Sequence, residues 1–158
     1  MQYYDIIAES YDELHGEEQR KKLEIISKYI KPEEYSSILD VGCGTGICSV
    51  WQHFSVGADP SFGLIREAKK KGSNFIQAKA ENLPFKNHSF DIVISVTAIH
   101  LFEDADKALS EMKRVGKNKF VFSVLKKSSR SKEIIKKIDL NFKIRKKIEE
   151  ERDTILLT

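Results

Sequence analysis

The sequence has few cysteines, no long apolar run and no secretion signal. Cys43 and Cys48 are the only cysteines among 158 residues, too few to complete a four-ligand zinc site. A disulfide between them would distort the glycine-rich segment that they flank, so we interpret both as reduced. No run of about 18 apolar residues indicates a membrane span. The N-terminus lacks the basic and apolar regions of a signal peptide, so we expect a cytoplasmic protein.

Internal repeats, low-complexity tracts and linkers are also missing from the sequence. We therefore expect one domain over 1–158, with an N-terminal helical cap at 1–35 and an α/β core at 36–158. The composition, with 41% hydrophobic and 32% charged residues, is ordinary for a soluble enzyme. The formal charge of +3 is uneven, because residues 117–158 carry 13 basic and 6 acidic side chains. Such a segment is either a solvated face or a surface that attracts an anionic substrate or nucleic acid.

Apolar periodicity predicts helices alternating with short strands. The expected helices cover 3–14, 17–30, 47–52, about 64–71, 104–115 and 129–138. The expected strands cover 37–41, 54–58, 75–76, 90–96 and 120–125, followed by a hairpin formed by 142–148 and 154–157 around a turn at 150–152. A long basic helix is the alternative for that last segment.

The stretch from Ser37 to Gly46 organises the rest of the chain. A buried strand carries Asp40 near its carboxyl end, and glycines follow at 42, 44 and 46. Strand-to-glycine-loop junctions of this kind bind nucleotides in open α/β sheets. A dinucleotide fingerprint would need a third glycine where Ile47 stands, and Asp40 would repel a pyrophosphate. A phosphate-binding P-loop is excluded because no Gly-Lys-Ser/Thr follows.

A ligand that carries positive charge and no phosphate removes both objections. S-adenosylmethionine is such a ligand, with a sulfonium and an ammonium group beside ribose and adenine. Asp59 ends the second strand, 17 residues after Gly42, where its carboxylate can accept hydrogen bonds from both ribose hydroxyls.

Four segments in order resemble the motifs of class I S-adenosylmethionine-dependent methyltransferases. They are Ile-Leu-Asp-Val-Gly-Cys-Gly-Thr-Gly at 38–46, Gly-Ala-Asp-Pro-Ser at 57–61, Ala-Glu-Asn-Leu-Pro-Phe at 80–85, and Phe-Asp-Ile-Val-Ile-Ser at 90–95 followed by Ile99-His100. The chain is most similar to small, single-domain members that act on quinones, other small molecules or tRNA wobble uridine. The resemblance implies a Rossmann-like, mostly parallel seven-stranded sheet with helices on both faces and a C-terminal antiparallel hairpin.

The resemblance also assigns residues to S-adenosylmethionine, whose product is S-adenosylhomocysteine. Glycines 42, 44 and 46 would pass under the methionine part, with Asp40 near its ammonium group and Asp59 on the ribose. The remaining implied cofactor contacts are Ala80, Glu81, Ser95, Val96 and Tyr11. Two features depart from the family. Lys79 stands where relatives often have an acid near the adenine amino group, and almost no insertion follows the fifth strand, where many relatives build a substrate lid.

Methyl transfer needs an aligned nucleophile and needs a base only when the acceptor must lose a proton. His100, just past the fourth strand, is the candidate base; its alternative is a hydrogen bond to the backbone. Thr97 and Tyr4 are candidate substrate contacts, and their alternatives are a loop cap and helix packing. No metal set can be assembled from the four histidines.

The expected acceptor is a small molecule. Ser95-Val96-Thr97-Ala98 replaces the Asn/Asp-Pro-Pro-Tyr motif of enzymes that methylate adenine amines or glutamine amides, which disfavours those substrates. One alternative is a tRNA or RNA methyltransferase that uses the basic C-terminal surface. A second is a non-catalytic subunit of the same fold that needs a partner protein. A homodimer or an activating partner that completes the site also stays open.

Overall fold

The structure is a computed structural model that describes residues 2–31, 37–46, 55–72 and 74–158. Its helices are α1 (Gln2–Ile7), η1 (Ala8–Ser10), α2 (Tyr11–Ser27), α3 (Phe62–Lys71), η4 (Ile99–Leu101), α4 (Ala105–Val115) and α5 (Ser131–Asn141). Its strands are β1 (Ile38–Val41), β2 (Ser55–Asp59), β3 (Phe75–Gln77), β4 (Phe90–Val96), β5 (Gly116–Leu125), β6 (Lys146–Glu149) and β7 (Asp153–Leu157). The helix expected at 47–52 and the expected strand residue Phe54 lie outside the described residues.

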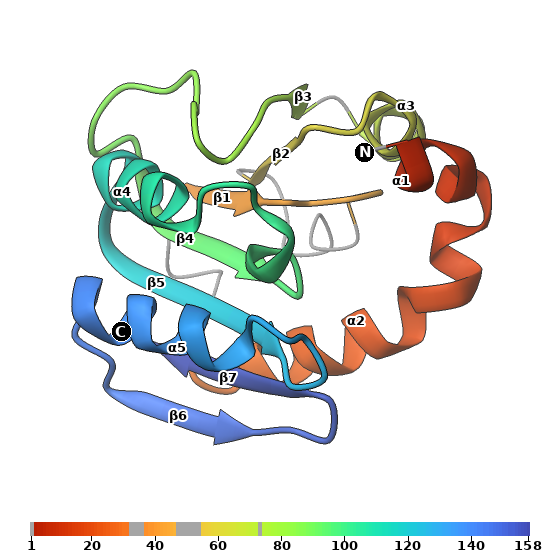
Figure 1. Cartoon of the computed structure of the whole chain (residues 1–158). Helices are drawn as coiled ribbons and strands as arrows, with labels where there is room; N and C mark the ends of the chain where they lie inside the picture. The colour runs from red at the N-terminus through yellow and green to blue at the C-terminus, as the bar shows by residue number, and fades with distance from the viewer. Residues whose placement is uncertain (1, 32–36, 47–54, 73) are drawn as a thin grey trace.

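The strands form one seven-stranded sheet in the order β3-β2-β1-β4-β5-β7-β6 (Figure 1). Strands β1 to β5 are parallel, whereas β7 runs antiparallel to both β5 and β6. The predicted sheet and its closing hairpin are therefore confirmed, and the long-helix alternative for the C-terminal segment is wrong.

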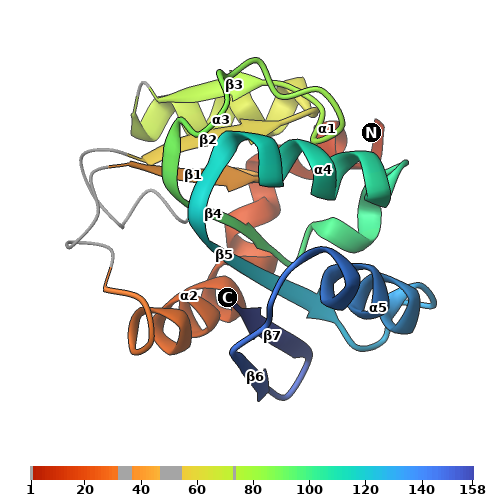
Figure 2. The ribbon, with the colours of Figure 1, turned by 90° about the vertical axis from the view of Figure 1, so that its left-hand side faces the viewer.

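Helices cover both faces of the sheet (Figure 2). On one face, α4 and α5 pack against side chains such as Val93 and Phe122, which belong to the largest apolar cluster. On the other, α2 places Leu23 and Ile26 against Ile92 and Ile94. Because β4 is buried on both faces, five of its seven residues are apolar, as expected for a central parallel strand.

The N-terminal helices differ from the prediction. The expected break near residues 15–16 is absent, and α2 runs through Gly16; the chain instead breaks at η1, between Ala8 and Ser10. This break lets α1 lie against α3 while α2 crosses the sheet (Figure 1). Strand β5 also begins earlier than expected, directly at Gly116.

Two glycines of the loop after β1 are required by packing as well as by backbone conformation. Gly42 and Gly46 have φ of 78° and 76°, a region that favours glycine. A Cβ on Gly42 would lie 2.4 Å from Ala98 Cβ, and one on Gly46 would lie 2.4 Å from the Phe75 ring. Gly44 has φ of 56°, but a Cβ there would meet Tyr11 only at an ordinary 3.6 Å. Gly44 is therefore required by its backbone conformation and not by close packing, and the Tyr11 ring lies beside it.

No helix among the described residues is long and apolar enough to cross a membrane. Within the same residues, no cluster of three or more His, Cys, Asp or Glu side chains could hold a metal ion.

Candidate active site

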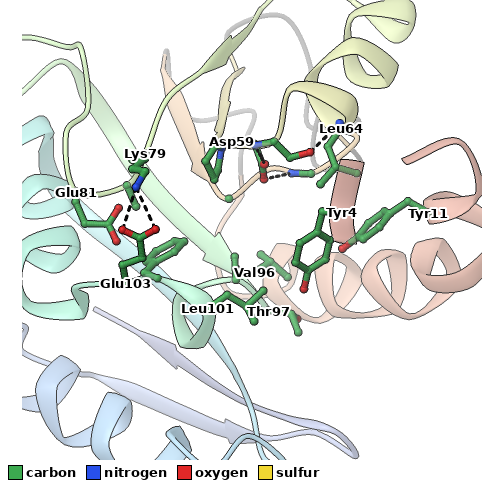
Figure 3. Close-up of a pocket in the computed structure, with 17 residues that line it drawn as sticks. Tyr4, Tyr11, Asp59, Leu64, Lys79, Glu81, Val96, Thr97, Leu101 and Glu103 are labelled. Atoms are coloured by element: carbon green, nitrogen blue, oxygen red, sulfur yellow. Dashed lines mark hydrogen bonds and ion pairs between the residues drawn. The ribbon is translucent and has the colours of Figure 1, made fainter. Parts of the chain in front are cut away.

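A pocket of about 820 Å³, measured with its open mouth, lies at the edge of the sheet where the parallel strands end. The loops that follow β1, β2, β3 and β4 form its walls, and α1 and α2 close one side (Figure 3). Nine of the residues predicted from the sequence line it: Tyr4, Tyr11, Gly42, Gly44, Asp59, Ala80, Glu81, Val96 and Thr97. The other four, which are Asp40, Gly46, Ser95 and His100, do not belong to the lining.

Asp59 joins two walls of this pocket. Its Oδ2 accepts a hydrogen bond from the backbone N–H of Gly44 at 3.0 Å, and its Oδ1 accepts one from Ser61 N–H at 2.9 Å. The side chain is buried, and that burial raises the pKa of Asp59 despite the two backbone hydrogen bonds, which lower it. A carboxylate has about four lone-pair sites, so two acceptor positions remain for a ligand with vicinal hydroxyls.

Asp40 lies outside the lining but within electrostatic reach of it. The residue is buried on β1, between Gly57 of β2 and Ile94 of β4. Burial is the main cause of the raised pKa values of Tyr11 and Cys43, and the Asp40 charge adds to both shifts. A cationic ligand group near Tyr11 would therefore be attracted by Asp40.

Two tyrosines from the cap form one end of the pocket. The rings of Tyr4 and Tyr11 lie 6.3 Å apart, centroid to centroid. Burial raises the pKa of both phenols, so both stay neutral at physiological pH and offer hydroxyl groups and aromatic faces to a ligand.

Two aspartates that the sequence analysis missed fasten the cap onto the pocket loops. Asp5 Oδ1 accepts hydrogen bonds from Ser61 Oγ at 2.6 Å and from Gly63 N–H at 2.8 Å. Asp12 contacts the Thr45 hydroxyl and the Lys71 ammonium. The two acids are seven residues apart, but the break at η1 lies between them, so no helical periodicity in the sequence related them to one another.

Thr97 lies at the end of β4 with φ of 54°, a conformation that is rare for a β-branched residue. Its hydroxyl accepts a hydrogen bond from Lys22 Nζ at 2.8 Å and donates one to Asp153 Oδ2 at 2.8 Å. The hydroxyl is thus engaged inside the protein, which is the arrangement that a structural role for Thr97 requires.

Lys22, the centre of this polar network, is completely buried. Besides Thr97, its ammonium group contacts Glu18 Oε1 at 2.6 Å and Asp153 Oδ1 at 3.1 Å, and Ser123 donates to the same aspartate. The network joins α2, β5 and β7 beneath the end of β4, from residues far apart in the sequence.

His100 lies on η4 beside this network and not in the pocket lining. Its Nδ1 is buried without a hydrogen-bond partner among the described residues. Burial lowers the pKa of His100, the neighbouring Lys22 and Arg130 charges lower it further, and Asp153 opposes them. The imidazole is therefore neutral near pH 7. Ser95 is also fully buried, with a hydroxyl that has no partner in the described part of the chain.

The opposite end of the pocket carries charged side chains. Lys79 Nζ lies 2.9 Å from Glu103 Oε2, so the pair links the loop after β3 to the segment after η4 (Figure 3). A second link joins the same segments, because Glu81 Oε1 accepts a hydrogen bond from Asp104 N–H at 3.2 Å. Glu103 was missed by the sequence analysis, since nothing in the sequence relates it to Lys79, 24 residues earlier.

The site therefore combines a glycine loop that lines the pocket at Gly42 and Gly44, a buried carboxylate with about two further acceptor positions, and two neutral phenols within reach of a second acid. These groups fit a nucleoside that bears a positively charged substituent.

Comparison with known proteins agrees with this geometry. Residues 39–123, more than half of the chain, match the methyltransferase domain family. The chain therefore belongs to that family, and its sequence and fold are those of a class I S-adenosylmethionine-dependent methyltransferase of the small type.

Individual relatives are similar over the same region. An uncharacterized protein of Methanocaldococcus jannaschii is 39% identical over 128 residues, which cover 78% of this chain and 50% of that protein. The ubiquinone/menaquinone biosynthesis C-methyltransferase UbiE of Campylobacter jejuni is 35% identical over 121 residues, which cover 68% of this chain and 51% of that protein. The human protein named probable tRNA methyltransferase 9B is 29% identical over 120 residues, which cover 72% of this chain and 26% of that protein. The chain thus spans about half the length, or less, of these curated relatives.

Among solved structures, the PH0226 protein of Pyrococcus horikoshii superposes with a TM-score of 0.72. It is 22% identical, and the match covers 87% of this chain and 88% of that one. At this identity the similarity establishes the fold alone.

Proposed function

We propose that the protein transfers the methyl group of S-adenosylmethionine to a small-molecule acceptor. The observation that carries this proposal is the bridging position of Asp59, which lines the pocket, accepts hydrogen bonds from the backbone of Gly44 and Ser61, and has about two further acceptor positions. In this proposal residues 1–158 act as one methyltransferase domain, in which 1–35 is the cap and 36–158 is the core.

The assigned contacts follow the pocket from end to end. Asp59 binds the ribose hydroxyls, and Ala80 and Glu81 flank the adenine. Gly42 and Gly44 pass under the methionine part, whose ammonium group is attracted by Asp40 and Tyr11. Gly46 holds the turn of the loop, and Ser95 and Val96 support the ligand from the end of β4.

Bound S-adenosylmethionine would supply an activated methyl carbon, and the chain aligns an acceptor with it and excludes water. Val96, Ala98, Leu101 and Phe102 form an apolar wall on the side of the pocket that follows β4, and Tyr4 and Thr97 complete the proposed acceptor end. An apolar wall suits an uncharged organic acceptor, and the similarity to a quinone C-methyltransferase supports that class. His100, if it is the base, would have to reach the acceptor from behind this wall.

Isothermal titration calorimetry with S-adenosylhomocysteine tests the cofactor assignment. We expect Asp59→Asn to weaken binding by about tenfold or more, because charge-assisted hydrogen bonds to the ribose are lost. Asp106→Asn, which changes an exposed acid on α4, is the matched control and should bind as the wild type does. Unchanged affinity in Asp59→Asn would show that the ribose is held elsewhere.

A wild-type protein that binds no cofactor at millimolar concentration would overturn the proposal and favour the alternative of a non-catalytic subunit. If the cofactor binds, screening the purified protein for methyl transfer to quinones, other metabolites and tRNA identifies the acceptor class.

The second candidate, an RNA methyltransferase, is favoured by the basic C-terminal surface. Five exposed cations, Lys127, Lys132, Lys136, Lys143 and Arg145, have no side-chain hydrogen bond or ion pair with the described residues. Lys132 and Lys136 lie one turn apart on α5, so they present two charges on one face. The similarity to a protein named as a tRNA methyltransferase supports the same candidate.

Titration of tRNA at two salt concentrations separates the two candidates. If the surface binds RNA, Lys132→Glu/Lys136→Glu should weaken binding and reduce its salt dependence by about two phosphate contacts. The control is the double variant Lys28→Glu/Lys69→Glu, which makes the same charge change at the end of α2 and on α3. It should weaken tRNA binding less than Lys132→Glu/Lys136→Glu does. No binding, or binding without salt dependence, removes the RNA candidate.

A further inference from the structure

One end of the pocket is built from charged side chains that the proposed methyl transfer does not use. Lys79 and Glu103 both line it, with the Lys79 ammonium 3.1 and 2.9 Å from the two carboxylate oxygens. The pair raises the pKa of Lys79, mainly through its hydrogen bond to Glu103. A lysine and a glutamate held in this way present a fixed carboxylate at the pocket edge.

The position of this end relative to Asp59 determines which part of a nucleoside would reach it. The loop after β3 is tied to the end of β2, because Ala78 N–H donates to the Asp59 carbonyl at 3.1 Å. In Figure 3, Lys79, Glu81 and Glu103 lie on one side of Asp59, and Tyr4 and Tyr11 lie on the other. A ribose carries its base on C1′ and its 5′ substituent on C4′, one at each end of the ring, so the two extend to either side of the residue that binds the 2′ and 3′ hydroxyls. With the cationic substituent at the tyrosines and Asp40, the base extends toward Lys79 and Glu103.

The chemistry of the pair favours one kind of base. A carboxylate only accepts hydrogen bonds, and a lysine only donates them. Because the Lys79 ammonium already contacts both carboxylate oxygens, Glu103 is the member of the pair that remains to read the base. Glu81, the other carboxylate at this end, already accepts a hydrogen bond from Asp104 N–H. A 6-amino purine presents N–H donors to a carboxylate, whereas a 6-oxo purine presents an oxygen at the same position and is repelled.

The geometry points to Glu103 as the residue that determines specificity for a 6-amino purine, with Lys79 as its positioning residue. This inference rests on the proposed function, since it places the adenine of the cofactor at this end. Glu103 and Lys79 side chains are 72% and 48% exposed, so a free glutamate would sample many rotamers there. The double contact with Lys79 favours one orientation of the Glu103 carboxylate, and the Glu81 link to Asp104 joins the same two segments.

The test compares two ligands that differ at one position of the base, S-adenosylhomocysteine and its deaminated 6-oxo analogue, S-inosylhomocysteine. Calorimetry on the wild type should give about tenfold or greater preference for the amino compound. Glu103→Ala should reduce the preference to about threefold or less, chiefly by weakening the amino compound. Lys79→Met should reduce the preference for the amino compound in part. Lys79→Arg, which preserves the ion pair, should keep the wild-type preference.

Lys117→Met is the matched control, because it removes a comparable half-exposed ion pair, with Asp91, that does not line the pocket. It should leave both affinities unchanged. If Glu103→Ala binds S-adenosylhomocysteine with the wild-type preference, the inference is wrong and the proposed function stands. If the wild type binds neither ligand, both are overturned. A loss of preference in Glu103→Ala that Lys79→Met does not share would refute the positioning role of Lys79.

Discussion

Lys22 shows how a single side chain links the cap to the pocket. It belongs to α2, yet its ammonium group is buried against Thr97 at the end of β4 and against Asp153 of β7. Buried charges are tolerated only when they are paired and hydrogen-bonded, and Lys22 has two acidic partners, Asp153 and Glu18, besides the Thr97 hydroxyl. The strained backbone of Thr97, which costs about 1–3 kcal/mol at such positions, persists only where surrounding contacts hold it.

We expect Lys22→Met to be strongly destabilising, by about 3–5 kcal/mol, because Asp153 would be left as a buried carboxylate without its cation. Urea unfolding measures this loss. Lys22→Met/Asp153→Asn should recover part of it, since the uncompensated charge is then removed. Lys21→Met is the control, because its exposed pair with Glu17 lies one residue away; equal midpoints for the two single variants would contradict the proposed importance of the network.

At the scale of elements, the sequence was most informative where one local signal decided the structure. The strongly apolar segment at Phe90–Val96 predicted β4 with its observed bounds. Asp104 was placed at the start of the following helix, and its side chain does cap α4 by accepting from Lys107 N–H at 3.0 Å. Alternation after Phe142 predicted the hairpin, although β6 starts only at Lys146.

Elements that depend on distant partners were predicted less well. Apolar periodicity predicted separate helices at 3–14 and 17–30, with a break at residues 15–16, yet α2 continues through Gly16. Gly16 is buried within α2, and α1 packs against α3. The position of the break follows from these tertiary contacts, which the local sequence does not contain. The same applies to the site: motif spacing predicted Asp59 and the glycine loop, but Glu103 and the Lys22 network become neighbours only when the sheet is assembled.

On the scale of the whole molecule, the cap is fastened to the core by polar contacts at loops that line the pocket. Asp5 holds Ser61 and Gly63 at the start of α3, Asp12 holds Thr45 in the glycine loop, and Lys22 holds Thr97. Because each contact joins the cap to a different pocket loop, we infer that folding of the cap and formation of the pocket are coupled. The Asp5 contact makes this coupling testable by pH.

The pKa of Asp5 is lowered, first by its hydrogen bond from Ser61 and then by that from Gly63. Its contribution to stability is therefore fully present above its unfolded pKa of 3.8 and is lost as pH falls through the lower folded value. Asp5→Asn keeps an acceptor oxygen but removes the charge, so it should be less stable than the wild type at about pH 7 and approach it below about pH 3. Thermal unfolding across this range measures the difference, with Asp139→Asn, an exposed acid on α5, as the control. A wild-type advantage over Asp5→Asn that stays constant with pH would show that the carboxylate charge does not fasten the cap.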